Sequence, residues 1–258
     1  MDTKKTIEHI ASWLRDYSNQ SKTNGFVVGI SGGIDSALTS TLCALTGKNV
    51  LCLLMPIHQH QNEFDRSHEH VQWLTKNFTN VSHTTVNLSD TFDALSKVVP
   101  SEAKHNLTLA NTRARIRMTT LYAFAGAQGL LVAGTGNKVE DFGVGFYTKY
   151  GDGGVDLSPI ADLMKSEVFA LAKELNIIDA IQTARPTDGL WADGRTDEDQ
   201  LGASYDELEW AMNAYNVDPK NRFSGRQEEV FKIFTYLHRA NRHKMDAIPV
   251  CNIPESLK

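Results

Sequence analysis

FVVGISGGIDSAL, residues 26–38, joins a short apolar run to a segment whose apolar residues have helical spacing. The run 26–30 is typical of a buried strand. Ile34, Leu38 and Leu42 predict the helix that follows it. A strand that turns through glycines into a helix is the first unit of an α/β fold.

Further apolar runs alternate with helical patterns along the chain. The runs are residues 50–54, 81–88 and 130–133, and the helical patterns cover residues 34–45, 63–78 and 107–128. Most of the runs are continuously apolar, which indicates strands that are buried on both faces of a parallel sheet. The predicted fold class is therefore α/β, with a doubly wound, mainly parallel sheet, helices on both faces and a Rossmann-like topology. Ligands of such sheets bind beyond the carboxyl ends of the strands, here in the loops after Ile30, Leu54 and Ala133.

Three more patterns predict structure outside the sheet. Apolar residues of segment 7–14 recur at helical spacing and predict an amphipathic N-terminal helix. Thr196 with Asp199 resembles a capping box and predicts a helix that continues through Leu208. The aromatic stripe within residues 231–237 is interpreted as core or subunit contact.

Composition and charge narrow the class of protein. Of the 258 residues 41% are hydrophobic, and no repeat, low-complexity tract or linker divides them, so we expect a single domain of residues 1–258. No run approaches the ~20 apolar residues of a membrane span, and the N-terminus lacks the apolar core of a signal peptide. We therefore expect a cytoplasmic protein with no membrane partner. A net charge of -5 argues against a nucleic-acid partner, and Cys43, Cys52 and Cys251 are expected to be reduced thiols.

The glycine-rich junction predicts a phosphate-binding turn. Glycines let successive backbone N–H groups converge, and the N-terminus of the following helix adds about half a positive charge. Ser31 and Ser36 flank the turn, and Asp35 lies where a magnesium ion could bind beside the phosphates. The alternative is that Gly32 and Gly33 only make a tight turn and that Asp35 or Ser36 caps the helix. The spacing matches neither the P-loop nor the G-x-G-x-x-G fingerprint.

Residues 31–36, SGGIDS, resemble the pyrophosphate-binding signature of the N-type ATP pyrophosphatases, which cleave ATP between the α and β phosphates. Later segments are similar, in order, to the ammonia-dependent NAD synthetases. These segments are residues 111–118, 134–140, 146–156, 159–165, 186–191 and 196–198, followed by His243 and Lys244. The resemblance covers nearly the whole chain, so the sequence is identified as a member of this family. It implies a ligase with an adenine nucleotide alpha hydrolase-like fold.

The resemblance implies the final step of NAD biosynthesis. In this family the carboxylate of deamido-NAD (nicotinic acid adenine dinucleotide) attacks the α-phosphorus of ATP in the presence of Mg²⁺, and pyrophosphate leaves. Ammonia then displaces AMP from the adenylated intermediate to give NAD. Such chemistry needs groups that stabilise the charge on pyrophosphate and needs no protein nucleophile. The family is homodimeric, with its dinucleotide site at the subunit interface, so we expect a homodimer.

The resemblance also implies a role for each residue at a matching position. The ATP site consists of Gly29, Ser31, Gly32, Gly33, Asp35, Ser36, Thr135, Lys165 and Thr187. The magnesium ligands are Asp35 and Glu140. The deamido-NAD site consists of Arg115, Lys149, Asp156, His243 and Lys244. Asp152 corresponds to the ammonia site, where a carboxylate attracts ammonium and accepts its proton, so Asp152 and Lys165 are the expected catalytic residues.

Several of these positions have a simpler interpretation. Glu140 fits an ordinary solvated loop acid, and Asp152 fits a residue of a glycine-rich turn. Lys165 opens a predicted helix, where the helix dipole disfavours a cation, and this slightly favours a functional role. The alternating arginines of segment 113–117 fit a charged helix face, yet residues two apart lie on nearly opposite sides of a helix. We therefore expect that the three arginines do not share one face.

Two observations bear on the choice between related activities. Asp188 stands where relatives often carry alanine, which puts the geometry of loop 186–191 in question. Glutamine-using NAD synthetases carry an additional amidase domain, for which 258 residues leave no room, so we expect ammonia as the donor unless a separate glutaminase subunit delivers it.

Two rival hypotheses remain. One is an adenylating enzyme with another acceptor, such as a GMP synthetase ATPase unit or a tRNA-modifying enzyme. The other is a nucleotide-binding regulator without catalysis. The joint presence of Asp35, Glu140 and Lys165 favours catalysis.

Overall fold

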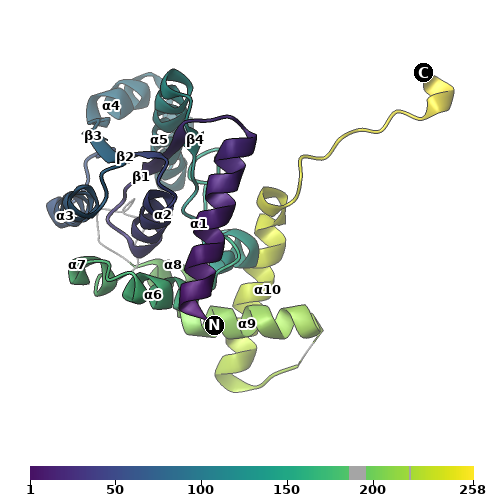
Figure 1. Cartoon of the computed structure of the whole chain (residues 1–258). Helices are drawn as coiled ribbons and strands as arrows, with labels where there is room; N and C mark the ends of the chain where they lie inside the picture. Colours follow the sequence, from purple (N-terminus) through teal and green to yellow (C-terminus); the bar gives the residue numbers. More distant parts are fainter. Residues whose placement is uncertain (186–195, 221) are drawn as a thin grey trace.

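The computed structural model describes residues 1–185, 196–220 and 222–258. Within these residues the centre of the molecule is a four-stranded sheet with the order β3-β2-β1-β4 (Figure 1). The strands are β1 (Gly25–Gly29), β2 (Asn49–Leu54), β3 (Val81–Thr85) and β4 (Leu131–Val132). All three neighbouring pairs are parallel. The predicted α/β fold with a parallel sheet is confirmed.

Helices connect the strands and continue after the last one (Figure 1). The first five are α1 (Thr3–Gln20), α2 (Ile34–Leu45), α3 (Gln61–Asn77), α4 (Ser89–Val98) and α5 (Asn106–Gln128). After β4 follow the π-helical turn η2 (Val139–Val144), α6 (Lys165–Glu174), α7 (Asp179–Gln182), α8 (Asp197–Leu201), α9 (Tyr205–Val217) and α10 (Gly225–Met245). Short 3-10 turns are η1 (Ser101–Ala103) and η3 (Glu255–Leu257). The predicted N-terminal helix and the helices between the strands are confirmed.

Both faces of the sheet carry helices, because successive residues of a strand point to opposite sides. On one face Phe26 and Val28 pack with apolar residues of α1, α2 and α6. On the other face Val27 and Val132 pack with residues of α4 and α5. This alternation confirms the predicted doubly wound arrangement.

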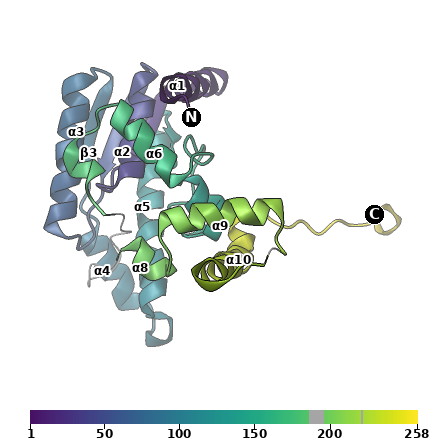
Figure 2. The same ribbon diagram turned by 90° about the horizontal axis from the view of Figure 1, so that it is seen from below.

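A third apolar cluster lies between α9, α10 and η2. Figure 2 shows α9 and α10 next to each other, beside the layers of the α/β unit. Phe231 and Phe234 of the aromatic stripe are buried in this cluster, which confirms their interpretation as core residues. Because η2 carries Glu140, the cluster also fixes one side of the site described below.

Two predicted elements differ from the structure. The strand predicted over residues 81–88 ends at Thr85 and is mostly exposed, because β3 is an edge strand with the polar sequence VSHTT. The helix predicted to run through Leu208 is two helices. Gly202 ends α8 in the left-handed conformation with a φ of 77°, and Ser204 caps the N-terminus of α9. No helix among the described residues is long and apolar enough to cross a membrane.

Candidate active site

A cavity of about 680 Å³ lies at the carboxyl edge of the sheet. Its walls come from the turn after β1, the loops after β2 and β4, the inner side of α5 and the first residue of α6. The predicted site residues that line it are Gly29, Ser31, Gly32, Gly33, Asp35, Ser36, Thr135, Glu140, Asp152, Lys165 and Lys244. The structure thus brings together every described residue that the sequence assigned to ATP, magnesium or ammonia.

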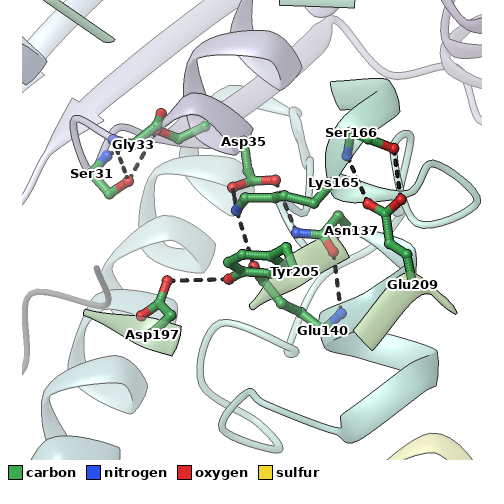
Figure 3. Close-up of polar contacts among 11 residues, drawn as sticks. Ser31, Gly33, Asp35, Asn137, Glu140, Lys165, Ser166, Asp197, Tyr205 and Glu209 are labelled. Atoms are coloured by element: carbon green, nitrogen blue, oxygen red, sulfur yellow. Dashed lines mark hydrogen bonds and ion pairs between the residues drawn. The ribbon is translucent and has the colours of Figure 1, made fainter. Parts of the chain in front are cut away.

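The turn after β1 is held by its two serines. Ser31 Oγ and Ser36 Oγ lie 3.1 Å apart, and the Gly33 N–H donates to Ser31 Oγ at 3.2 Å (Figure 3). Gly32 has a φ of 86°, and a Cβ there would lie 2.7 Å from a backbone carbonyl oxygen of α3, so glycine is required. Gly33 is the N-cap of α2 and provides no side-chain cap. The alternative in which Asp35 or Ser36 caps the helix is therefore wrong.

A buried lysine joins the two predicted magnesium ligands. Lys165 Nζ lies 2.5 Å from Asp35 Oδ2 and 3.0 Å from Glu140 Oε1 (Figure 3). The Lys165 side chain is 3% exposed and each carboxylate side chain is 17% exposed. Asn137 links the same groups, since its Nδ2 donates to Asp35 Oδ1 at 3.0 Å and its Oδ1 accepts from the Glu140 N–H at 3.2 Å. We call Lys165, Asp35 and Glu140 the lysine cluster. The interpretation of Glu140 as an ordinary solvated acid is wrong.

Tyr205, in the first turn of α9, completes this arrangement. Its hydroxyl donates to Glu140 Oε1 at 2.6 Å and lies 3.3 Å from Asp197 Oδ2. Its ring centroid lies 4.7 Å from Lys165 Nζ, within the range of a cation–π interaction. Sequence analysis did not single out Tyr205, because no spacing links it to the motifs of the cavity.

The start of α9 is anchored to the start of α6. The Ser166 N–H and Oγ donate to the two carboxylate oxygens of Glu209 at 2.8 and 2.7 Å (Figure 3). A carboxylate at a helix N-terminus is favourable, so Glu209 also offsets the unfavourable position of Lys165 at the same helix end. These bonds keep Tyr205 beside the lysine cluster.

The charges of the lysine cluster are strongly coupled. Burial raises the pKa of Asp35, and the charge of Glu140 adds to this while Lys165 opposes it. Burial also acts to raise the pKa of Glu140, but the Lys165 ammonium and the Tyr205 hydroxyl outweigh it and lower that pKa. Burial alone would lower the pKa of Lys165, yet the two carboxylates raise it. Lys165 therefore stays charged at neutral pH.

The donor set of the cluster fits Mg²⁺. Asp35 and Glu140 follow different strands and meet at one point, and carboxylate oxygen is the ligand that this ion prefers. The described residues contain no group of three or more His, Cys, Asp or Glu that could hold a metal. Two carboxylates suit an ion that arrives with phosphates, because Mg²⁺ in nucleotide sites is held by one or two carboxylates, substrate phosphates and water.

Asp152 lies in the loop between η2 and α6 and lines the cavity. Its Oδ1 accepts a hydrogen bond from the Thr148 N–H at 3.0 Å. Burial raises the pKa of Asp152, although this hydrogen bond partly opposes the effect. Gly151 brings the loop against α5, since a Cβ there would lie 2.8 Å from Ala114 Cβ. Asp152 thus belongs to a turn, as the simpler interpretation has it, and also places a carboxyl group in the cavity.

Of the five residues that the resemblance assigned to deamido-NAD, Lys244 lines the cavity. Its Nζ donates to the carbonyl oxygens of Gly145 and Tyr147, each at 2.8 Å. Arg115, Lys149 and His243 lie together outside the cavity lining, and we call them the basic row. Arg115 Nη2 lies 3.3 Å from the Lys149 carbonyl oxygen, and Lys149 Nζ lies 2.5 Å from the His243 carbonyl oxygen.

The remaining predicted positions lie elsewhere. Asp156 does not line the cavity, and its carboxylate accepts hydrogen bonds from the Val132 N–H at 2.8 Å and the Tyr122 hydroxyl at 3.0 Å. It therefore fixes the end of β4 to α5. Thr187 and Asp188 fall outside the described residues.

The three arginines of α5 do not share one face, as predicted. Arg113 packs over the ring of Phe92 with its guanidinium carbon 4.6 Å from the centroid, whereas Arg115 donates to the Lys149 carbonyl oxygen. Arg117 lines the cavity and donates from Nε to the Met55 carbonyl oxygen at 3.0 Å. Sequence analysis quoted its segment but gave Arg117 no role.

Comparison with known proteins decides the family. The sequence model of the family described as NAD synthase matches residues 6–247. The chain belongs to the NAD synthase family. A curated relative, the NH(3)-dependent NAD(+) synthetase of Alkaliphilus metalliredigens, is 35% identical over 263 residues, which cover 98% of this chain and 100% of the relative.

Two solved structures show the same similarity in three dimensions. NMN synthetase from Francisella tularensis has a TM-score of 0.85 and 30% identity, over 98% of this chain and 100% of that one. The NH3-dependent NAD synthetase from Campylobacter jejuni, in complex with the nitrate ion, has a TM-score of 0.80 and 28% identity over the same shares. Membership in the NAD synthase family confirms the identification made from the sequence segments and the prediction of a ligase.

Proposed function

We propose that the chain catalyses the ATP- and Mg²⁺-dependent amidation of deamido-NAD by ammonia, which gives NAD, AMP and pyrophosphate. The observation that carries this proposal is the buried pairing of Lys165 with Asp35 and Glu140 beside the glycine turn. An adenylating site needs a cation and metal-binding carboxylates next to a phosphate cradle, and all three line one cavity. Membership in the NAD synthase family supports the choice of acceptor.

The first step is adenylation. An oxygen of the nicotinate carboxylate bonds to the α-phosphorus of ATP, and the bond from that phosphorus to pyrophosphate breaks. Bound Mg²⁺ would neutralise part of the charge that develops on the phosphates. The glycine turn 31–33 leaves the phosphates close to the N-terminus of α2, which stabilises the departing pyrophosphate, and Lys165 adds a positive charge. Asp35 and Glu140 would hold the metal.

The second step is amidation. The nitrogen of ammonia bonds to the activated carbonyl carbon, the bond from this carbon to AMP breaks, and one proton must leave the nitrogen. Asp152 is the group proposed to attract ammonium and to accept the proton that converts it to ammonia, and the second proton, released after the attack, passes to solvent. Its place on the cavity wall supports this role, and its raised pKa makes the carboxylate a stronger proton acceptor.

The basic row and Lys244 are proposed to bind the diphosphate of deamido-NAD. Positive side chains suit a diphosphate, and Lys244 joins the row to the cavity that holds the reacting carboxylate. Arg115 and His243 are exposed on the isolated chain. This exposure supports the proposal of a homodimer whose subunits enclose the dinucleotide between them.

A second candidate acceptor is the mononucleotide acid that lacks the adenylate half. It is favoured by the similarity, at a TM-score of 0.85, to a structure named NMN synthetase. Both acids present the same carboxylate to the cavity. They differ in the adenylate half, and only deamido-NAD carries the diphosphate that the basic row is proposed to bind.

One assay separates these possibilities. The purified chain is incubated with ATP, Mg²⁺ and either acid, with ammonium or glutamine as donor, and pyrophosphate and amide are measured. We expect NAD from deamido-NAD with ammonium alone. A higher kcat/KM for the mononucleotide acid than for deamido-NAD would show that the mononucleotide acid is the preferred acceptor. Pyrophosphate without amide would indicate a missing donor partner, and the absence of both products would favour a nucleotide-binding regulator.

A further inference from the structure

Lys165 pairs with two carboxylates in this structure, although it is also proposed to bind the phosphates of ATP. Its ammonium lies between the carboxylates of Asp35 and Glu140, at 2.5 and 3.0 Å. The same two carboxylates are the proposed ligands of Mg²⁺, and the same ammonium is proposed to bind the phosphates of ATP. An ammonium and a divalent cation that bind the same two carboxylates repel each other, so each weakens the binding of the other at this pair.

The contacts around the cluster show which member is able to leave. Asn137 donates to Asp35, and Tyr205 donates to Glu140 at 2.6 Å, so each carboxylate keeps a partner without the lysine. The lysine is a long flexible side chain that begins at the first residue of α6, where the helix dipole disfavours its charge. The exchangeable member is therefore Lys165.

We propose that Lys165 is the internal counter-ion of the metal site and that it makes the binding of divalent metal depend on the nucleotide. Without nucleotide, the ammonium neutralises the carboxylates and keeps the divalent cation out. The phosphates of ATP offer the ammonium a second set of anionic oxygens, and Asp35 and Glu140 become available to the metal. Metal and nucleotide then favour each other's binding, as any coupling between two sites is reciprocal.

This inference rests on the proposed function, because it assumes a metal–nucleotide site in the cavity. The test measures binding and not turnover. Mn²⁺ is used as the probe, and its binding to the full chain is measured by electron paramagnetic resonance with and without a non-hydrolysable ATP analogue. The variants are Lys165→Met and Lys165→Gln, which both remove the charge. The matched control is Lys138→Met, because Lys138 forms an exposed ion pair with Asp162 at 2.7 Å, outside the cavity lining.

We expect the wild-type chain to bind Mn²⁺ at least tenfold more tightly with the analogue than without it. Without the analogue, Lys165→Met is expected to bind Mn²⁺ at least tenfold more tightly than wild type, and Lys138→Met as wild type does. Lys165→Gln keeps a hydrogen-bonding group in the cluster, so it provides the same comparison if the methionine variant does not fold.

The outcomes that contradict the inference differ from those that contradict the proposed function. Equal or weaker Mn²⁺ binding by the charge-removing variants, together with normal binding to the wild-type complex with the analogue, would overturn the counter-ion role alone. Failure of the wild-type chain to bind Mn²⁺ even with the analogue would overturn the proposed metal site, and the inference with it.

Discussion

The lysine cluster and the basic row both concentrate charge, but they are built in different ways. In the cluster a side chain that is 3% exposed forms ion pairs with two carboxylates of the same chain. In the row, Arg115 and Lys149 contact backbone carbonyl oxygens at a more open surface. Under the proposed function, the difference means that one chain holds the groups for adenylation in place by itself, whereas the site for the dinucleotide is completed by a second copy of the chain.

Substitutions in the lysine cluster and in the basic row should change different kinetic constants. Changes in the lysine cluster should lower the rate of the chemical step, because its groups act on charge that develops during the reaction. Changes in the basic row should mainly raise the KM for the dinucleotide, because its groups bind a part of the substrate that does not react.

The largest effect is expected for Asp35→Asn. This change removes the charge of a proposed metal ligand while it preserves shape, so we expect adenylation to fall by about 10²–10³-fold with an unchanged fold. Pyrophosphate release in a single turnover measures the rate, and thermal melting checks the fold. Asp162→Asn is the control, because Asp162 is 96% exposed and pairs with Lys138. An unchanged rate of the variant at limiting Mg²⁺ would show that Asp35 is not a ligand of the metal.

Asp152→Asn changes a residue that lies between the two regions, since its loop lines the cavity and also carries Lys149. The variant tests whether adenylation and amidation depend on different residues. The asparagine is unable to accept the proton from ammonium, so NAD formation should fall by about 10²-fold. Pyrophosphate release should fall by a few-fold at most, because ammonia enters only in the second step. The two products are followed in the same reaction mixture. Equal losses in both would place Asp152 outside the ammonia site.

Arg115→Gln should act on binding. Loss of one charge-assisted contact to the diphosphate is expected to raise the KM for deamido-NAD by about tenfold and to leave the KM for ATP unchanged. The effect should decrease at high salt, which screens exposed charges, and should be smaller with the mononucleotide acid. Steady-state kinetics with both acids measure it. A lower kcat with an unchanged KM would contradict the distinction between the two regions.

The smallest effect is expected for Tyr205→Phe. It removes the hydroxyl that lies 2.6 Å from Glu140 but keeps the ring over Lys165. We expect the free energy of unfolding to fall by about 1 kcal/mol, and the Mg²⁺ concentration for half-maximal rate to rise a few-fold. Tyr236→Phe is the control, because Tyr236 is 71% exposed. Identical behaviour of the two variants would show that the hydroxyl does not position Glu140.

The sequence predicted where the site lies better than how its atoms pair. Glycines after β1 and acidic residues after two strands place Asp35 and Glu140 at one edge, because parallel strands end together there. The ion pair between Lys165 and Asp35 joins residues 130 positions apart. That contact depends on the packing of α6 against α2, which no local pattern contains.

Tyr205 was missed for a related reason. Its helix was predicted as part of a longer one that begins at Thr196, although Gly202 followed by Ser204 and Glu207 is a signature of a helix end and a new capping box. With that signature recognised, Tyr205 would have been placed in a first helical turn. Its contact with Glu140 still depends on the anchor between Ser166 and Glu209.

The proposed role of the lysine cluster requires an adenylated intermediate, which transfer of an oxygen isotope detects. Deamido-NAD labelled with ¹⁸O in the nicotinate carboxylate is converted with ATP, Mg²⁺ and ammonium, and the AMP is examined by mass spectrometry. Attack of the carboxylate on the α-phosphorus predicts AMP that carries one ¹⁸O from the substrate. Unlabelled AMP formed together with NAD would contradict the adenylated intermediate and the role assigned to the cluster.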